Sequence, residues 1–280
     1  MWGIYTGNIP QTSVWGAFLT GFIMDIFQSV IIGIIEGVSE FLPISSTAHM
    51  VLAAKVLNIQ QTDFVKSFEI IIQFGAILSV VVLYWKRFLL DFESLKRVLA
   101  AFIPTALLGF ILYKLIKGYL IANQTIIVWS LLLGGLFLIV FELFHKENES
   151  ALDDLSTIPY SKCVMIGLFQ SLAMFPGVSR SAATIIGGLL LNLKRQTIVE
   201  FSFLLAVPTM LAASALDLLK NGGSFSMDQV GVLAVGFVVS FVVALLSIEF
   251  LLRYIKKHSF IPFGVYRIII ALVFMFGLLR

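Results

Sequence analysis

Long apolar stretches separated by short polar segments run along most of this chain. A membrane-spanning helix needs about 20 predominantly apolar residues, and six stretches reach or approach that length without clustered charge. They cover residues 68–85, 97–116, 124–144, 199–219, 229–252 and 261–279. The pattern predicts an all-α polytopic membrane protein with six transmembrane helices.

Two further apolar stretches, residues 24–56 and 162–195, are each interrupted near the middle. The interruptions read LPISS at 42–46 and FPGVS at 175–179. Proline lacks an N–H and ends the helix before it, and the serine that follows suits the N-cap of a second, short helix. We therefore expect two re-entrant helical hairpins. Such irregular backbone is stable at membrane depth only where it is buried in protein or lines a wet cavity.

The two interrupted stretches resemble each other when Gly33 is aligned with Gly167. The aligned pairs are Glu36 with Gln170, Phe41 with Phe175, Ser45 with Ser179 and Thr47 with Ser181. Within a residue, the same offset pairs Phe68 with Phe201. The single membrane domain, 24–280, is therefore predicted to contain two repeats, about 24–144 and 162–280. Each has a hairpin and three spans, and because three crossings is odd, the second repeat is inverted in the membrane.

The first 23 residues are predicted to form a separate N-terminal extension. Residues 13–23 resemble the apolar core of a signal peptide, but no basic residue precedes them and no convincing small-residue cleavage site follows. We therefore interpret residues 1–23 as a retained segment that leads into the first membrane helix.

Composition supports a membrane protein and narrows its partners. Hydrophobic residues make up 59% of the 280 positions, charged residues only 12%, and the mean hydropathy is +1.02. A soluble domain carries about a quarter charged residues, so the excess apolar surface is expected to face membrane lipids. The net charge of +3 comes without a basic run, which speaks against nucleic acid. The lone Cys163 excludes an internal disulfide and a cysteine-based metal cluster.

The basic residues of the loops predict an orientation. Loops around 86–97, 145–162, 194–195 and 253–257 carry eleven Lys and Arg residues, whereas the opposite side carries six. The richer side is expected to be cytoplasmic. This places the first hairpin and the C-terminus at the outer face, and the second hairpin at the cytoplasmic face.

The first hairpin concentrates ionisable and nucleophilic side chains. Glu36 and Glu40 are four residues apart and share a face of the incoming half-helix. Ser46 and His49 are three residues apart and share a face of the outgoing one. The second hairpin adds Arg180. Each charge at membrane depth costs about 3 kcal/mol, so three of them (Glu36, Glu40 and Arg180) cost on the order of 9 kcal/mol and indicate a functional site.

An anion is the expected ligand of that site. Two half-helix N-termini would present free N–H groups and partial positive charge at one depth, and Arg180 offers a planar fork that suits phosphate. The hydroxyls predicted to bind phosphate are those of Ser45, Thr47, Ser179, Ser181 and Thr184. Two carboxylates would repel a diphosphate, so we expect a divalent cation, Mg²⁺ or Ca²⁺, held by Glu36 and Glu40.

Structural explanations of the same residues remain open. Arg180 could pair with Glu36 or Glu40 and simply lock the two halves together. His49 alone is more often a hydrogen-bonded core histidine than a catalyst, and serines at helix breaks are more often caps than nucleophiles. Glu69 is expected near the entrance or facing headgroups, and Arg267 is expected to snorkel or pair structurally.

At the two hairpins the chain resembles the bacterial undecaprenyl-diphosphatase family of the bacitracin-resistance type. That family carries Glu-x-x-x-Glu running into Pro-x-Ser-Ser-Thr-x-His, matched here from Glu36 to His49. It also carries Pro-Gly-x-Ser-Arg-Ser-x-x-Thr, matched here from Pro176 to Thr184. The likeness covers residues 24–280, with further similarity at 68–76 and 262–267, and the first 23 residues depart from it.

The resemblance implies an inner-membrane enzyme that hydrolyses undecaprenyl diphosphate to undecaprenyl phosphate and phosphate. This reaction recycles the lipid carrier of peptidoglycan synthesis and gives resistance to bacitracin. It implies Ser46 as the nucleophile or a phosphate ligand, His49 as its acid/base partner, and Glu36 and Glu40 as residues of metal or proton handling. Because the loop charges place the first hairpin at the outer face, the site is expected to open to the periplasmic face. Direct attack by water that His49 activates stays an alternative, and a homodimer stays open.

The rival interpretation is a transporter or flippase for polyprenyl phosphate. Inverted repeats with broken helices are common in transporters. A carrier needs a binding site but no nucleophile beside a base, so phosphate release without a membrane gradient distinguishes the two. Both activities could also coexist on one scaffold.

Overall fold

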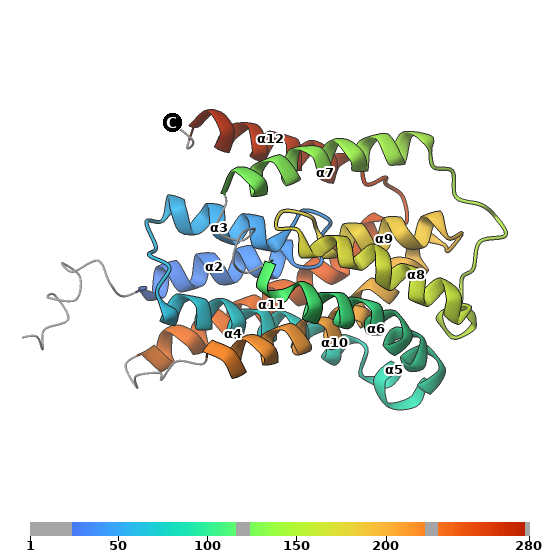
Figure 1. Ribbon diagram of the computed structural model, residues 1–280, viewed down its shortest axis with the longest axis horizontal. Coiled ribbons are helices and arrows are strands. Elements are labelled where there is room, and N and C mark those ends of the chain that lie inside the picture. Colours follow the sequence, from blue (N-terminus) through green and yellow to red (C-terminus); the bar gives the residue numbers. More distant parts are fainter. Residues whose placement is uncertain (1–23, 116–123, 222–228, 278–280) are drawn as a thin grey trace, which may run out of the picture.

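A computed structural model describes residues 24–115, 124–221 and 229–277 (Figure 1). These residues form α-helices and two short 3₁₀ turns, and no strand is assigned among them. The predicted all-α class is therefore confirmed. The predicted N-terminal extension, 1–23, lies outside the described residues.

Five helices among the described residues are long and apolar enough to cross a membrane. They are α4 (Asp63–Leu83), α6 (Phe92–Leu115), α7 (Gln124–Phe144), α10 (Arg195–Asn221) and α11 (Val230–Tyr254). The last helix, α12 (Ile261–Gly277), is apolar but has only 17 described residues. The structure thus supports a multi-pass protein, while the arrangement of six spans with two re-entrant hairpins stays a prediction. A short helix that the pattern missed, α5 (Trp85–Leu90), joins α4 to α6.

Both predicted helix breaks are present. In the first hairpin, α2 (Ile26–Ser39) is separated from α3 (Ser46–Val56) by residues 40–45. In the second, α8 (Tyr160–Ser171) and its 3₁₀ extension η3 (Leu172–Met174) are separated from α9 (Arg180–Leu190) by residues 175–179. A second 3₁₀ turn, η2 (Leu155–Thr157), precedes α8.

The two predicted serine caps behave differently. The hydroxyl of Ser179 accepts a hydrogen bond from the backbone N–H of Ala182 at 3.2 Å, as an N-cap should. Ser45 also stands at the N-cap position, but its side chain makes no capping bond. Its φ is 76°, a left-handed value that is uncommon outside glycine. The prediction of a capping serine is therefore wrong for Ser45, because its backbone does not adopt the extended conformation that is typical of an N-cap residue.

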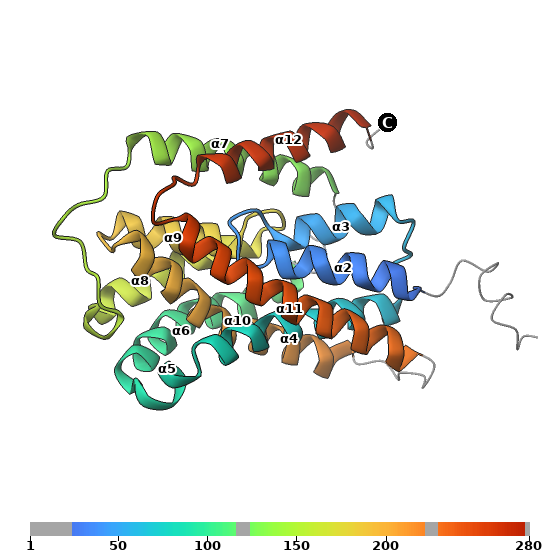
Figure 2. The same cartoon turned by 180° about the vertical axis from the view of Figure 1, so that it is seen from behind.

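Each hairpin packs against a long helix from the other half of the chain. Helix α2 lies along α11, and α8 lies along α6 (Figures 1 and 2). Glycine permits both close approaches. A Cβ at Gly33 would meet the Gly236 carbonyl, and one at Gly167 would collide with the Ala101 carbonyl. Small residues at such crossings are typical of helix packing in membranes.

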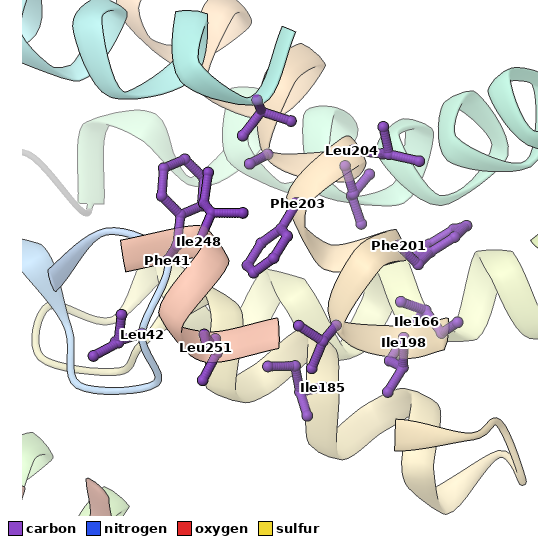
Figure 3. Close-up of a cluster of buried hydrophobic side chains, with 14 of the residues drawn as sticks. Phe41, Leu42, Ile166, Ile185, Ile198, Phe201, Phe203, Leu204, Ile248 and Leu251 are labelled. Carbon is purple, nitrogen blue, oxygen red and sulfur yellow. The ribbon is translucent and has the colours of Figure 1, made fainter. Parts of the chain in front are cut away.

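A large buried apolar cluster fixes the first break against the second hairpin and the long helices behind it (Figure 3). Phe41, in the break, meets Phe203 of α10 edge-on with ring centroids 5.4 Å apart. The same cluster includes Leu42 from the break, Ile185 from α9, and Ile248 and Leu251 from α11. This packing places the polar residues that flank Phe41 beside the N-terminus of α9.

Helices α7 and α12 pack chiefly on each other and form an edge of the bundle (Figures 1 and 2). A smaller buried cluster connects them to α3 through Ala48 and Leu52, which meet Ile127, Val128, Leu131 and Ala271. Many outward-facing side chains of this pair, such as Leu133, Phe137 and Ile269, are large, apolar and exposed. They suit contact with lipid.

Candidate active site

Glu40 links the two hairpins. It is the C-cap residue of α2, and one carboxylate oxygen, Oε2, accepts a hydrogen bond from Ser46 Oγ at 2.5 Å. The other, Oε1, accepts from Arg180 Nη2 at 3.3 Å and from its Nε at 3.4 Å. The two charged side chains are largely buried, with 7% of Glu40 and 12% of Arg180 exposed. Three residues that lie far apart in the chain thus meet in one cluster within the bundle.

Arg180 is the first residue of α9 and is held from several sides. Its Nη1 donates to the Ser202 carbonyl of α10 at 2.8 Å. Its guanidinium also lies over the ring of Phe41, 5.9 Å from the centroid. These contacts aim the guanidinium at the first hairpin. The expected structural pairing of Arg180 with a carboxylate is therefore present, and it involves Glu40.

His49 is bonded away from Ser46. Its Nδ1 lies 2.8 Å from the Ser45 carbonyl, one turn back along α3, and its Nε2 lies 3.0 Å from the Tyr266 hydroxyl. A carbonyl can only accept, so Nδ1 carries a proton, and in the neutral ring Nε2 accepts from Tyr266. The two rings are stacked, 5.5 Å apart and 7° from parallel. The partner expected for Ser46 from helical spacing was His49, and the structure places Glu40 there instead.

The hydroxyls of the second hairpin form bonds within the protein. Ser179 Oγ lies 3.0 Å from Ser181 Oγ, and Ser181 Oγ donates to the Leu42 carbonyl of the first break at 2.9 Å. Thr184 donates to the Arg180 carbonyl at 2.9 Å and lies 3.3 Å from the amide oxygen of Gln170. These residues therefore build the shape of the break and join it to the first hairpin.

The remaining predicted phosphate ligands are on the first hairpin. Ser45 is buried in the break, and Thr47 is exposed on the first turn of α3. Both flank Ser46, whose backbone N–H belongs to the free N-terminus of α3. The N-termini of α3 and α9 thus both lie at the Glu40 cluster, as an anion site requires.

Glu36 is the unusual group of the site. It is fully buried on α2, and neither carboxylate oxygen has a hydrogen-bond partner among the described residues. The nearby charges that act on it are those of Glu40, Glu69 and Arg180. An ionised carboxylate in such a place is costly unless a proton or a cation neutralises it.

The donors around Glu36 fit a hard divalent cation only in part. Carboxylate oxygens are the ligands that Mg²⁺ and Ca²⁺ prefer, and the two free oxygens of Glu36 could serve. Glu40 already binds Ser46 and Arg180 with its oxygens. Within the described ranges, no group of three or more His, Cys, Asp or Glu residues could hold a metal ion. A cation here would therefore need oxygens from the substrate to complete its coordination.

Arg267 was expected to snorkel or to pair structurally. The structure shows it 1% exposed in α12, so it does not snorkel. Its guanidinium donates to the Pro43 and Gly177 carbonyls, one from each helix break, at 3.3 and 2.9 Å. The sequence shows a charged residue inside an apolar span. It does not predict these partners, because every residue has a backbone carbonyl.

Comparison with known proteins places the chain in a family. The family model described as "Bacitracin resistance protein BacA" matches residues 29–273. An undecaprenyl-diphosphatase of Aquifex aeolicus is 54% identical over 248 residues, which are 89% of this chain and 96% of that protein. One of Sulfurihydrogenibium sp. is 53% identical over 251 residues, 90% of this chain and 98% of that protein. This chain therefore belongs to the BacA bacitracin resistance protein family.

Proposed function

We propose that this protein is a membrane phosphatase that hydrolyses undecaprenyl diphosphate to undecaprenyl phosphate and inorganic phosphate. The observation that carries the proposal is the cluster of Glu40, Ser46 and Arg180, assembled from both helix breaks. Relatives that share about half of their residues with this chain bear the name of this activity. Release of the monophosphate recycles the lipid carrier of peptidoglycan synthesis and gives resistance to bacitracin.

Ser46 is the proposed nucleophile and Glu40 its base. The bond of 2.5 Å between Ser46 Oγ and Glu40 Oε2 supports transfer of the hydroxyl proton to the carboxylate as the oxygen attacks the terminal phosphorus. The bond from that phosphorus to the bridging oxygen breaks, and undecaprenyl phosphate leaves. Water then attacks the phosphoserine, and inorganic phosphate is released as the proton returns to Ser46. This scheme replaces His49 by Glu40 as the base.

Arg180 and the two helix N-termini stabilise the charge on the phosphates. The guanidinium approaches Glu40 from the second hairpin, so a phosphoryl group that Ser46 attacks lies within its reach. His49, bonded to Tyr266, is left as a second proton carrier at the edge of the site. It could instead activate water for the second step.

Glu36 and Glu40 are the residues that would hold a divalent cation, Mg²⁺ or Ca²⁺. When bound, such a cation neutralises part of the charge that carboxylates and diphosphate bring together. The unpartnered oxygens of Glu36 support this assignment.

The proposed location is the bacterial inner membrane, with the site open to the periplasmic face and the isoprenyl tail left in lipid between helices. The difference of eleven against six basic loop residues supports this orientation. The exposed apolar side chains of the long helices support the lipid contact.

Phosphate release by the purified protein in detergent, without any gradient, tests the function. We expect release that depends on a divalent cation, and a loss of at least about 100-fold in kcat for Ser46→Ala. Ser247→Ala is the matched control, because the Ser247 hydroxyl donates to the Val243 carbonyl in the preceding turn of its own helix, α11. Retained lipid binding with no phosphate release by the unmodified protein would favour a carrier. Near-full turnover in Ser46→Ala would exclude Ser46 as the nucleophile.

A further inference from the structure

Arg267 is the largest fully buried side chain among the described residues, and its guanidinium bonds backbone carbonyls. Besides Pro43 and Gly177, its guanidinium donates to the Ser130 and Leu131 carbonyls of α7, at 3.1 and 3.4 Å. The ion pairs found among the described residues do not include it. Its charge is therefore balanced by carbonyl dipoles, two of which belong to the helix breaks.

The two break carbonyls occupy equivalent places in the repeat. Pro43 and Gly177 are separated by 134 residues, the same offset that aligns Ser45 with Ser179. One guanidinium thus joins the same point of both hairpins. Three residues further along each hairpin stand Ser46 and Arg180, the two groups that bind Glu40. A shift of either break relative to the other would change the distance between these groups.

A glycine in α7 provides the space that the Arg267 guanidinium occupies. A Cβ at Gly134 of α7 would collide with the Arg267 guanidinium, so glycine there is what allows the side chain to pass. The residue before Arg267, Tyr266, bonds His49 on the outgoing half-helix of the first hairpin. One turn of α12 therefore contacts both breaks and the imidazole beside them.

The hydrogen bonds of Arg267 argue against a role in phosphate binding. A guanidinium has five N–H donors, and the Arg267 guanidinium makes four bonds to carbonyls. It is also almost completely buried, at 1% exposed. Arg180, by contrast, bonds the Glu40 carboxylate as well as the Ser202 carbonyl, and 12% of its side chain is exposed.

We propose that Arg267 is a positioning residue, which ties the two helix breaks together and so sets the separation between Ser46 and Arg180. The inference rests on the site proposed above. Positioning of this kind has large kinetic consequences, because a displacement of about 1 Å can lower a rate about 100-fold. Buried carbonyls at the breaks also need donors, and Arg267 supplies them where the helices have none.

Two variants, Arg267→Lys and Arg267→Met, test the proposal. Lysine keeps the charge but cannot span carbonyls from three segments, since its ammonium is a compact point with three donors. We expect Arg267→Lys to fold, with kcat lowered about 10- to 100-fold and KM within about threefold of the unmodified value. Arg195→Lys is the matched control. Arg195 is also a largely buried guanidinium, but it pairs with Glu142 away from the breaks, and its kcat is expected to change less than about threefold.

A distance measurement separates this inference from the proposed chemistry. In a Cys163→Ala background, spin labels at the exposed residues Val56 of α3 and Leu190 of α9 report on the two hairpins in the substrate-free protein. We expect the distance distribution to broaden or shift in both Arg267 variants and to stay unchanged in Arg195→Lys. This result does not depend on turnover, so it holds even if Ser46→Ala kept activity and the proposed nucleophile were wrong.

Four outcomes would overturn the inference. The first is native kcat in Arg267→Lys, and the second is an unchanged distance distribution in both variants. The third is a KM raised more than about tenfold at unchanged kcat, which would make Arg267 a substrate ligand. If neither variant folded while Arg195→Lys did, Arg267 would be a general stability element and the proposal would equally fail.

Discussion

The two hairpins share a plan but differ in how their buried polar groups are satisfied. Glu36 in the first and Gln170 in the second occupy equivalent positions. In the part of the chain that the structure describes, both oxygens of Glu36 lack a hydrogen-bond partner. The amide nitrogen of Gln170 donates to Thr105 and Thr209 at 3.0 and 3.1 Å, and its oxygen lies 3.3 Å from the Thr184 hydroxyl. The second hairpin is thus a closed structural unit, whereas the first keeps a buried group that needs a ligand or a proton.

The two helix breaks also differ in backbone conformation. The first holds Ser45 at a φ of 76°, a conformation that costs a non-glycine residue on the order of 1–3 kcal/mol. The second places Ser179 in ordinary extended backbone and uses Gly177 for its left-handed residue. Non-glycine residues in such conformations cluster at active sites. This difference supports the proposal that the first break carries the nucleophile and that the second holds it in place.

The alignment of the two hairpins also explains how Arg180 and Glu40 come together. Ser46 and Arg180 are equivalent in the repeat, and both bind Glu40, which has Met174 as its counterpart. Divergence at a few positions of two similar hairpins would thus give the proposed nucleophile and its base on one side and a cation on the other. Substitutions in each hairpin test this division of roles.

Arg180→Lys is expected to have the largest effect. Lysine keeps one positive charge at the second hairpin but loses the fork that contacts Glu40 and the Ser202 carbonyl together. We expect kcat/KM for undecaprenyl diphosphate to fall about 100-fold, with a small change in Tm. A decrease of less than about threefold would show that any cation suffices, and that the second hairpin does not orient the phosphates.

Exchanging the equivalent residues Glu36 and Gln170 tests whether the two hairpins differ in how they satisfy this buried position. Glu36→Gln is expected to lower kcat about 10- to 100-fold and weaken the dependence on divalent cation, while raising Tm, because an unpartnered buried carboxyl is removed. Gln170→Glu is expected to destabilise the protein by about 2–4 kcal/mol, because it buries a charge and removes the donor to Thr105 and Thr209. For both variants, kcat is measured as a function of Mg²⁺ concentration and Tm is measured by thermal unfolding. Changes of the same sign and size in kcat and Tm for the two variants would contradict a difference in role between Glu36 and Gln170.

Tyr266→Phe is expected to have a moderate effect. The variant removes the hydroxyl bonded to His49 Nε2 and keeps the stacked ring. If His49 is a secondary proton carrier, kcat should fall about three- to tenfold with Tm nearly unchanged. Tyr254→Phe is the control, since Tyr254 stacks on His258 in the same manner, with ring centroids 4.5 Å apart, at the end of α11. A loss as large as that of Arg180→Lys would return His49 to the role of principal base.

The smallest expected effect compares the two break serines. Ser45→Gly should raise stability by about 1 kcal/mol, because glycine adopts the left-handed conformation without strain. Ser179→Ala should lower it by about 1 kcal/mol, because the cap of α9 is lost. Chemical unfolding in detergent measures both. Shifts of the same sign would mean that the two breaks do not differ in strain.

The positions of the helix breaks could be predicted because they depend on local chemistry. Pro43 and Pro176 interrupt apolar runs, and the break residues follow directly. The meeting of the two hairpins was predicted from the proposed repeat, because inverted halves would bring equivalent points together. Glu40, Ser46 and Arg180 were candidate site residues on these grounds, and the structure places them in contact.

The contacts inside the site could not be predicted in the same way. Helical spacing paired Ser46 with His49, but Ser46 is the first residue of α3, and the turn at Ser45 directs its hydroxyl back to Glu40. The role of Arg267 depends on carbonyls of three segments. Side-chain partners of this kind follow from backbone dihedral angles and tertiary packing, which residue types alone do not specify.

Glu40 and Arg180, from opposite hairpins, are proposed to act as one unit on the diphosphate. A double-mutant cycle of Glu40→Gln and Arg180→Gln, measured as kcat/KM for phosphate release in detergent, determines whether they do. We predict strong non-additivity, with the double variant within about threefold of the slower single variant. Losses that multiply, so that the double variant is slower by the product of the two single effects, would contradict a shared site.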